Sequence, residues 1–278
     1  MNLSTYAYAL GIKKDLLSVI GEGANVIILT DGSGIAFKFP KHKQALPWLL
    51  HEIEIINHIS KNLSVRVPDY FDIYLDRPIG EAYCAYSLIP GVQLSKEIYA
   101  LHRSKISKQL LSLLDEIHTM APLEIIDGNK IDFENMLHDI QTLIFPLIED
   151  EVKWDIYSRF KAYLQDISQI SQSNCVIHGD LGGANILCDP EAGIITGIID
   201  WAETAIDDPA IDYSALTCIA SIPQCKEDFL LLRPSLSTTF QRSNFIQYTF
   251  PLQAALHGIR TNDEEALQIG LNAIYRHI

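Results

Sequence analysis

The chain of 278 residues is 48% hydrophobic and 20% charged, which excludes general disorder and allows a sizeable buried core. Its net charge of −14 disfavours nucleic acid and anionic membranes as partners and favours a cationic one, although acidity also serves solubility alone. The five cysteines form no C-x-x-C pair, and no apolar run approaches the roughly 20 residues of a membrane span. We therefore expect a cytoplasmic monomer without disulfides.

The N-terminal part is predicted to be rich in β-structure. Residues 1–20 read as a short helix, because apolar and basic residues alternate there at helical spacing. Two β-rich runs follow, Val26–Leu29 and Ile35–Phe39, and the turn residues between them predict a hairpin. Pro40 ends the second strand, since proline cannot donate to the hydrogen-bond ladder.

A helix and two further strands complete this first lobe. Apolar positions recur every three or four residues over 46–59, which predicts an amphipathic helix. Strand-like runs then cover about 65–73 and 82–88. Pro90-Gly91 interrupts the pattern, and we place the lobe boundary there, with a first lobe at 1–90 and a second at 91–278.

The second lobe is predicted to be mainly helical, with one β-like insert at residues 175–200. Helical patterns cover residues 104–120, 133–149, 152–171, 209–221 and 241–277. The chain as a whole therefore belongs to the α+β class, with a small β-rich lobe followed by a larger helical one.

Three polar residues of the insert lie where its predicted strands end: Asp180, Asn185 and Asp200. Aspartate and asparagine often only cap turns. Phosphoryl transfer, however, needs a carboxylate that accepts the proton of the attacking hydroxyl, and oxygen ligands for Mg²⁺ on the nucleotide phosphates. Protein kinases use an Asp, an Asn five residues later and an Asp after a hairpin. The complete pattern favours a phosphotransferase over turn capping.

The motif from His178-Gly179-Asp180-Leu181 to Asn185, followed by Ile199-Asp200-Trp201, resembles the signature of the aminoglycoside phosphotransferase family and its macrolide-kinase relatives. The resemblance implies a two-lobed protein-kinase-like fold and transfer of a nucleotide γ-phosphate to an antibiotic hydroxyl. It implies Asp180 as catalytic base, and Asn185 and Asp200 as Mg²⁺ ligands. By the same resemblance His178 supports the loop.

The following segment, Ala205–Asp212, extends the resemblance and is also similar to macrolide kinases. Asp208 and Asp212 look like loop-fixing and helix-capping groups, because an Asp-Pro pair is typical of a helix start. Glu203 is the first candidate for contact with the substrate.

The first lobe contains the elements of a nucleotide site. Gly21 and Gly23 precede the hairpin, where backbone amides can approach phosphates. Lys38 lies on the second strand, from which it can pair with the α- and β-phosphates, and an acid on the next helix can hold it there. Of Glu52 and Glu54 we favour Glu52, because the family pattern has an apolar pair three and four residues after the acid.

The region around Lys38 most resembles aminoglycoside 2″-phosphotransferases. In that resemblance the segment Tyr86–Gly91 corresponds to the hinge, whose backbone groups at Ser87 and Ile89 bind the purine of ATP or GTP. The choice between the two nucleotides stays open.

We therefore expect a kinase of aminoglycosides, with a small cationic substrate facing acids such as Glu203 and, further along, Asp263, Glu264 or Glu265. A macrolide 2′-phosphotransferase and a kinase of a small amine or sugar metabolite are the alternatives that the same motifs serve. A non-catalytic pseudokinase is disfavoured, because the residues for catalysis and metal binding are all present.

Overall fold

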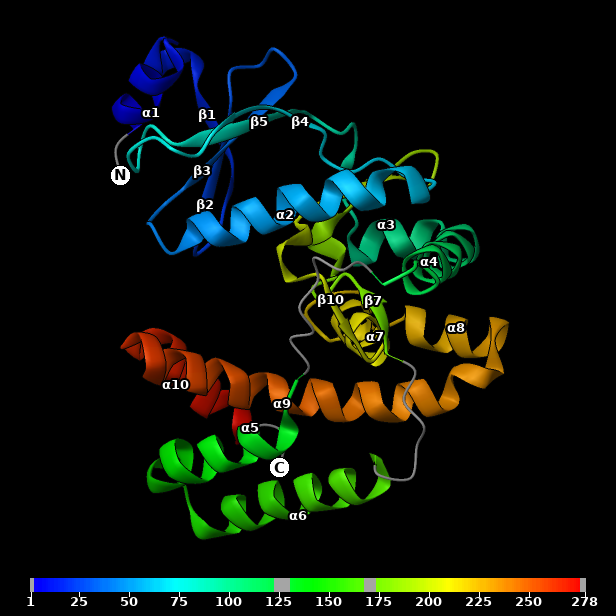
Figure 1. Ribbon diagram of the computed structural model, residues 1–278. Coiled ribbons are helices and arrows are strands. Elements are labelled where there is room, and N and C mark those ends of the chain that lie inside the picture. Colours follow the sequence, from blue (N-terminus) through cyan, green and yellow to red (C-terminus); the bar gives the residue numbers. More distant parts are fainter. Residues whose placement is uncertain (1–2, 123–130, 168–173, 276–278) are drawn as a thin grey trace.

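A computed structural model describes residues 3–122, 131–167 and 174–275 (Figure 1). A small lobe with an antiparallel sheet lies above a larger lobe that is mostly helical, as the sequence predicts. Helix α2 runs between the sheet and the larger lobe. No helix in the described ranges is long and apolar enough to span a membrane.

The sheet of the small lobe has the strand order β1-β2-β3-β5-β4, with every neighbouring pair antiparallel. Its elements are α1 (Leu3–Leu10), β1 (Ser18–Glu22), β2 (Val26–Thr30), β3 (Ile35–Pro40), α2 (Ala45–Ile59), β4 (Tyr70–Tyr74) and β5 (Tyr83–Ser87). Helix α1 packs on the sheet through Tyr6, whose ring centroid lies 4.5 Å from that of Phe39. The predicted hairpin of β2 and β3 is therefore present.

Two boundaries in this lobe differ from the sequence prediction. The first helix ends at Leu10, because Gly11 follows with a positive φ of 66°, and the chain enters β1 at Ser18. Strand β1 is mostly exposed and shows no alternation of apolar and polar residues, so periodicity could not reveal it. Strand β4 begins only at Tyr70, after Pro68, which cannot donate to the ladder.

The larger lobe is built around α4, the core helix that packs against the β-insert and against α7 and α8. Its helices are α3 (Lys96–Leu101), α4 (Arg103–His118), α5 (Phe133–Asp139), α6 (Asp150–Ile167), α7 (Ala210–Thr217), α8 (Cys225–Leu232), α9 (Ser237–Thr261) and α10 (Glu264–Ile274). A second core cluster joins α5, α6, α9 and α10.

The strands of the larger lobe form small antiparallel pairs. Strand β6 (Val92–Gln93) pairs with β8 (Ile186–Asp189), which pairs with β9 (Ile194–Ile198). Strand β7 (Cys175–Ile177) pairs with β10 (Ala205–Asp207). The β-insert predicted at residues 175–200 is thus present, and it continues into β10, which the sequence analysis did not anticipate.

Several helical predictions need correction in detail. The pattern over 241–277 covers two helices, because Asn262 adopts a left-handed conformation and Asp263 caps α10. The pattern over 133–149 becomes α5, a π-helical stretch and a 3₁₀ turn. Helices α3 and α8, of six and eight residues, were not predicted.

The predicted lobe boundary falls between β5 and β6. Gly91 has a φ of +129°, and a Cβ atom there would lie 2.7 Å from the carbonyl oxygen of Cys188. Only glycine fits such a conformation and such a close approach. The crossing between the lobes is consequently held tightly against the β8–β9 hairpin.

Candidate active site

The loop between β7 and β8 carries the first two predicted site residues side by side. The Asn185 side-chain amide donates from Nδ2 to the Asp180 backbone oxygen at 2.8 Å and to Asp180 Oδ2 at 3.0 Å. This pairing leaves Oδ1 of Asn185 available as a ligand. The backbone N–H of Ile199 donates to the Asn185 carbonyl at 3.0 Å, so the loop is also tied to the end of β9, next to Asp200.

A buried carboxylate on α7 holds the start of this loop. Asp212 is fully buried and accepts hydrogen bonds from the backbone N–H groups of His178 at 3.1 Å and Gly179 at 2.9 Å, and from Nε2 of His118 at 2.9 Å. Burial alone would raise its pKa, but the hydrogen bond and charge of His118 keep the pKa of Asp212 below its ordinary value. Asp212 is thus the loop-fixing group expected from the resemblance.

The ring of His178 links the loop to the strand that precedes Asp200. Its Nδ1 accepts from the backbone N–H of Asp180 at 3.2 Å, so its proton resides on Nε2 and is donated to the Ile199 carbonyl at 3.1 Å. The ring is buried beside Trp201. His178 therefore ties the backbone at Asp180 to the backbone at Ile199, and its buried ring is not available to contact a substrate.

Gly179 lets the loop approach the turn after β9. It has a φ of +87°, and a Cβ atom there would lie 2.1 Å from the carbonyl oxygen of Glu203. Any side chain would push the two backbones apart. This contact sets Glu203 beside Asp180.

Asp200 follows β9 in a left-handed conformation, with φ 67° and ψ 63°, and precedes a 3₁₀ turn at Trp201–Glu203. Its Oδ1 lies 3.3 Å from Nζ of Lys38 on β3. Lys38 in turn donates to Oε2 of Glu52 on α2 at 2.6 Å, with both side chains buried. The partner of Lys38 is therefore Glu52, as the sequence pattern favours, while Glu54 is exposed.

Charge is concentrated around this constellation. Burial would lower the pKa of Lys38, but the carboxylates of Glu52 and Asp200 raise it, which favours the charged form of the lysine. Burial, reinforced by the charge of Asp200, raises the pKa of Asp180 against the opposing effect of His178. Burial and the charges of Asp180 and Asp200 likewise raise the pKa of Glu203. Three carboxylates thus share a region of negative potential.

The donor chemistry fits a hard cation. Oδ1 of Asn185 and the half-exposed carboxylate of Asp200 are the oxygen ligands that Mg²⁺ prefers, and Mg²⁺ sites in nucleotide enzymes draw further ligands from phosphate and water. The described residues contain no group of three His, Cys, Asp or Glu arranged around a metal.

The remaining predicted nucleotide residues lie on the small lobe and at the crossing. The backbone N–H of Gly23 donates to the Val26 carbonyl at 2.9 Å, which closes the turn between β1, where Gly21 lies, and β2. Ser87 ends β5. The Ile89 side chain is buried so close to β9 that a Cβ atom on Gly197 would lie 2.6 Å from it.

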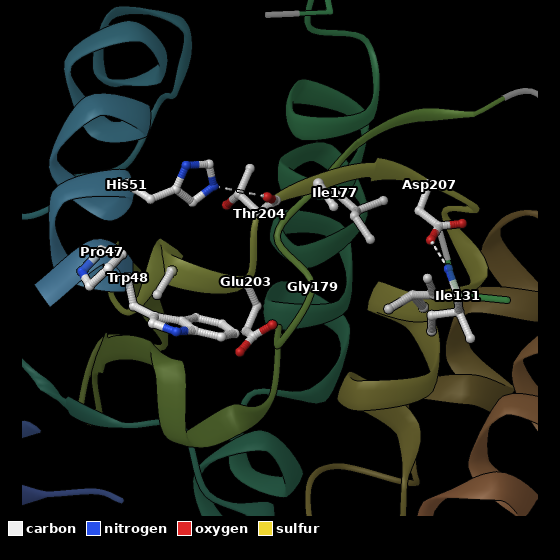
Figure 2. A pocket seen from close by; sticks show the side chains of 12 residues that line it. Pro47, Trp48, His51, Ile131, Ile177, Gly179, Glu203, Thr204 and Asp207 are labelled. Atoms are coloured by element: carbon white, nitrogen blue, oxygen red, sulfur yellow. Dashed lines mark hydrogen bonds between the residues drawn. The ribbon is translucent and has the colours of Figure 1, made fainter. Parts of the chain in front are cut away.

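Cavities open on both sides of the loop between β7 and β8 in the described structure. One, of about 450 Å³, is lined by Asp180, by residues following β6 and by Phe250 of α9. Another, of about 380 Å³, lies between α2 and the turn after β9 and includes Gly179 and Glu203 (Figure 2).

Trp48 and His51 of α2 line the 380 Å³ cavity, and sequence reasoning missed both. An exposed tryptophan among the apolar residues of an amphipathic helix was the available signal. Conversely, Asp263, Glu264 and Glu265 lie at the N-terminus of α10 and are absent from the lining of these two cavities, and that they face the acceptor stays a prediction. Their acidic side chains suit the positive end of that helix.

Residues 20–228 match the Phosphotransferase enzyme family, APH, and this match covers more than half of the chain. The chain belongs to this family and is a phosphotransferase. Viomycin phosphotransferase from Streptomyces vinaceus is 29% identical over 201 residues, which cover 68% of each protein.

Solved structures show the same kinase-like fold. The GDP and kanamycin complex of APH(2″)-IIia superimposes with a TM-score of 0.83 at 21% identity, covering 94% of this chain and 92% of that one. The macrolide 2′-phosphotransferase MphH from Brachybacterium faecium superimposes with a TM-score of 0.73 at 19% identity, covering 96% of both chains.

We expect Asp212→Asn to lower the free energy of unfolding by about 3–5 kcal/mol at pH 7, because it removes a buried, fully hydrogen-bonded charge. Since the pKa of Asp212 is depressed in the fold, its contribution is complete above the unfolded-state pKa of about 3.9 and is lost as the pH falls through the lower folded-state value. Urea denaturation of both proteins from pH 7 to acid should show the difference shrinking. A difference independent of pH would contradict the assignment.

We expect Lys38→Met to lower stability by about 3–5 kcal/mol, because it leaves Glu52 as a buried charge with no cation. The double variant Lys38→Met/Glu52→Gln removes that charge as well and should regain most of the stability. Neither variant should bind nucleotide normally. Chemical denaturation and nucleotide titration of the three proteins test this, and a double variant as unstable as the single one would refute it.

Proposed function

We propose that the protein transfers the γ-phosphate of ATP or GTP to a hydroxyl group of an aminoglycoside antibiotic. The observation that carries this proposal is the set of contacts that joins Asp180 to Asn185 and Asp200 to Lys38 and Glu52 across the two lobes. The set supplies a base, oxygen ligands and a fixed cation, which are the groups that phosphoryl transfer requires.

The small lobe is proposed to bind the nucleotide. Lys38, held by Glu52, would pair with the α- and β-phosphates, and the backbone amides at Gly21 and Gly23 would approach them from the β1–β2 turn. Backbone groups at Ser87 and Ile89 would bind the purine. In this division residues 1–90 carry the nucleotide, while residues 91–278 carry catalysis and the acceptor. GDP and ATP complexes among the structural relatives support a nucleotide co-substrate.

Asn185 and Asp200 would hold Mg²⁺, which supplies positive charge that offsets the phosphates when bound. Their oxygen atoms fit this role, since the Asn185 amide nitrogen is already engaged by Asp180. Lys38 lies close enough to Asp200 to keep its carboxylate aligned.

In the proposed reaction the acceptor hydroxyl oxygen forms a bond to the γ-phosphorus while the bond from that phosphorus to the bridging oxygen breaks. Asp180 orients the hydroxyl and takes its proton, and the nucleoside diphosphate leaves with the bridging oxygen. Burial and the neighbouring carboxylate raise the pKa of Asp180, which improves it as a proton acceptor. Asn185 keeps its side chain in place.

The negative potential of the cleft and the net charge of −14 favour a cationic acceptor. The kanamycin complex and the viomycin phosphotransferase among the relatives agree with this class. A macrolide acceptor is the second candidate, because the 450 Å³ cavity beside Asp180 includes the apolar side chains of Leu94 and Phe250. The five cysteines are free thiols, which supports a reducing, cytoplasmic location.

Replacing Asp180 by Asn should lower kcat about 10²–10⁴-fold, because the amide cannot take the proton. Nucleotide affinity should stay close to wild type, since Lys38 and Glu52 are untouched. Asp189→Asn is the matched control, because this aspartate lies on the same β-insert but only accepts bonds from its own turn. Steady-state turnover and nucleotide titration measure both effects. Near-normal turnover by Asp180→Asn would show that Asp180 is not the base of the reaction.

The acceptor class is tested by kcat/KM for kanamycin, viomycin and erythromycin at low and high ionic strength. For a polycation drawn to an acidic cleft, kcat/KM should fall about tenfold or more as salt rises. A mainly apolar site should respond little. Turnover of erythromycin alone, indifferent to salt, would favour the macrolide alternative, and turnover of none would point to a small amine or sugar metabolite.

A further inference from the structure

The 380 Å³ cavity between the lobes has no part in the nucleotide chemistry described above. Its walls come from α2 of the small lobe and from the segment 202–207 of the large lobe (Figure 2). Gly179 is part of the lining, so the cavity reaches the residue before Asp180. A molecule bound there would touch both lobes next to the reacting groups.

The cavity presents negative charge. Glu203 lines it, and the charges of Asp180 and Asp200 act on this carboxylate. None of the described lining residues is lysine or arginine, and His51 is the basic side chain among them. His51 already directs Nε2 toward the Thr204 carbonyl at 3.5 Å. The local field therefore favours a positively charged group.

An aromatic side chain lies beside this charge (Figure 2). Trp48 on α2 is 44% exposed, and Figure 2 shows its indole turned toward Glu203. Apolar side chains such as Pro47 and Ile177 continue the wall. An indole face attracts a cation, and a carboxylate next to it strengthens that attraction by ion pairing.

A buried hydroxyl group in the wall also lacks a partner. Thr204 is 4% exposed and lines the cavity, and its Oγ1 forms no hydrogen bond with any described residue. A buried hydroxyl group without a partner is unfavourable. A polar group of a ligand, or an ordered water molecule brought in with it, would satisfy this hydroxyl group.

We propose that this cavity is an acceptor subsite in which Trp48 and Glu203 together bind a cationic amino or guanidino group of the substrate. The inference rests on the proposed function and adds the small lobe to acceptor recognition. Trp48 and Glu52 are one helical turn apart on α2, so the helix that holds Lys38 also contacts the acceptor.

The test is calorimetric titration of the full chain, without nucleotide, using kanamycin and viomycin as the probes. Trp48→Ala and Glu203→Gln should each weaken the better-bound probe about tenfold, and Trp48→Phe should lie between wild type and alanine. Leu50→Ala is the matched control, because Leu50 is also on α2, is 47% exposed and is not among the lining residues. It should bind like wild type.

The inference is overturned if Trp48→Ala and Glu203→Gln bind both probes as Leu50→Ala does, or if the wild type binds neither probe. Phosphate transfer to the same probes is measured in parallel. Binding that responds to Trp48 and Glu203 without any transfer would support the subsite and reject the proposed function. If the wild type transfers phosphate but binding is unchanged by both substitutions, the proposed function is supported and the subsite is rejected.

Discussion

The buried ion pair of Lys38 and Glu52, extended to Asp200, is the constraint on which the architecture of the cleft depends. Two charged side chains that are almost fully removed from water are tolerable only together. The pair therefore fixes α2 against the sheet. The contact from Lys38 to Asp200 then relates that sheet to the large lobe. The buried charge of Lys38, which would be unfavourable without these partners, thus helps to fix the position of the small lobe on the large lobe.

The large lobe contains a second buried anion, Asp212. Asp212 binds two consecutive backbone N–H groups at the start of the catalytic loop, and His178 carries the connection on to the end of β9. Asp180 and Asp200 therefore rest on hydrogen-bonded groups that are more deeply buried than they are. This arrangement keeps a cluster of like charges in place, although mutual repulsion and burial both oppose it.

The sequence predicted the two lobes, the hairpin bearing Lys38 and the grouping of Asp180 with Asn185, because strand alternation and motif spacing are local properties. It did not predict β1, which is mostly exposed and lacks alternation, or β10, which depends on pairing with the distant strand β7. It also missed the short helices α3 and α8. The residues of the proposed acceptor subsite were harder still to predict. Trp48 and Glu203 meet only through tertiary packing, whereas the acids of α10, which looked equally suitable, lie elsewhere.

The left-handed backbone at Asp200 restricts what evolution can place there. Aspartate, asparagine and glycine enter that conformation readily, whereas a longer or branched side chain is strained. Glutamate would retain the charge but not the backbone preference, and glycine would retain the backbone but not the carboxylate. Asparagine alone keeps both the conformation and an oxygen atom, at the loss of the negative charge. Very few substitutions at this position can therefore keep both the backbone conformation and a side-chain oxygen atom.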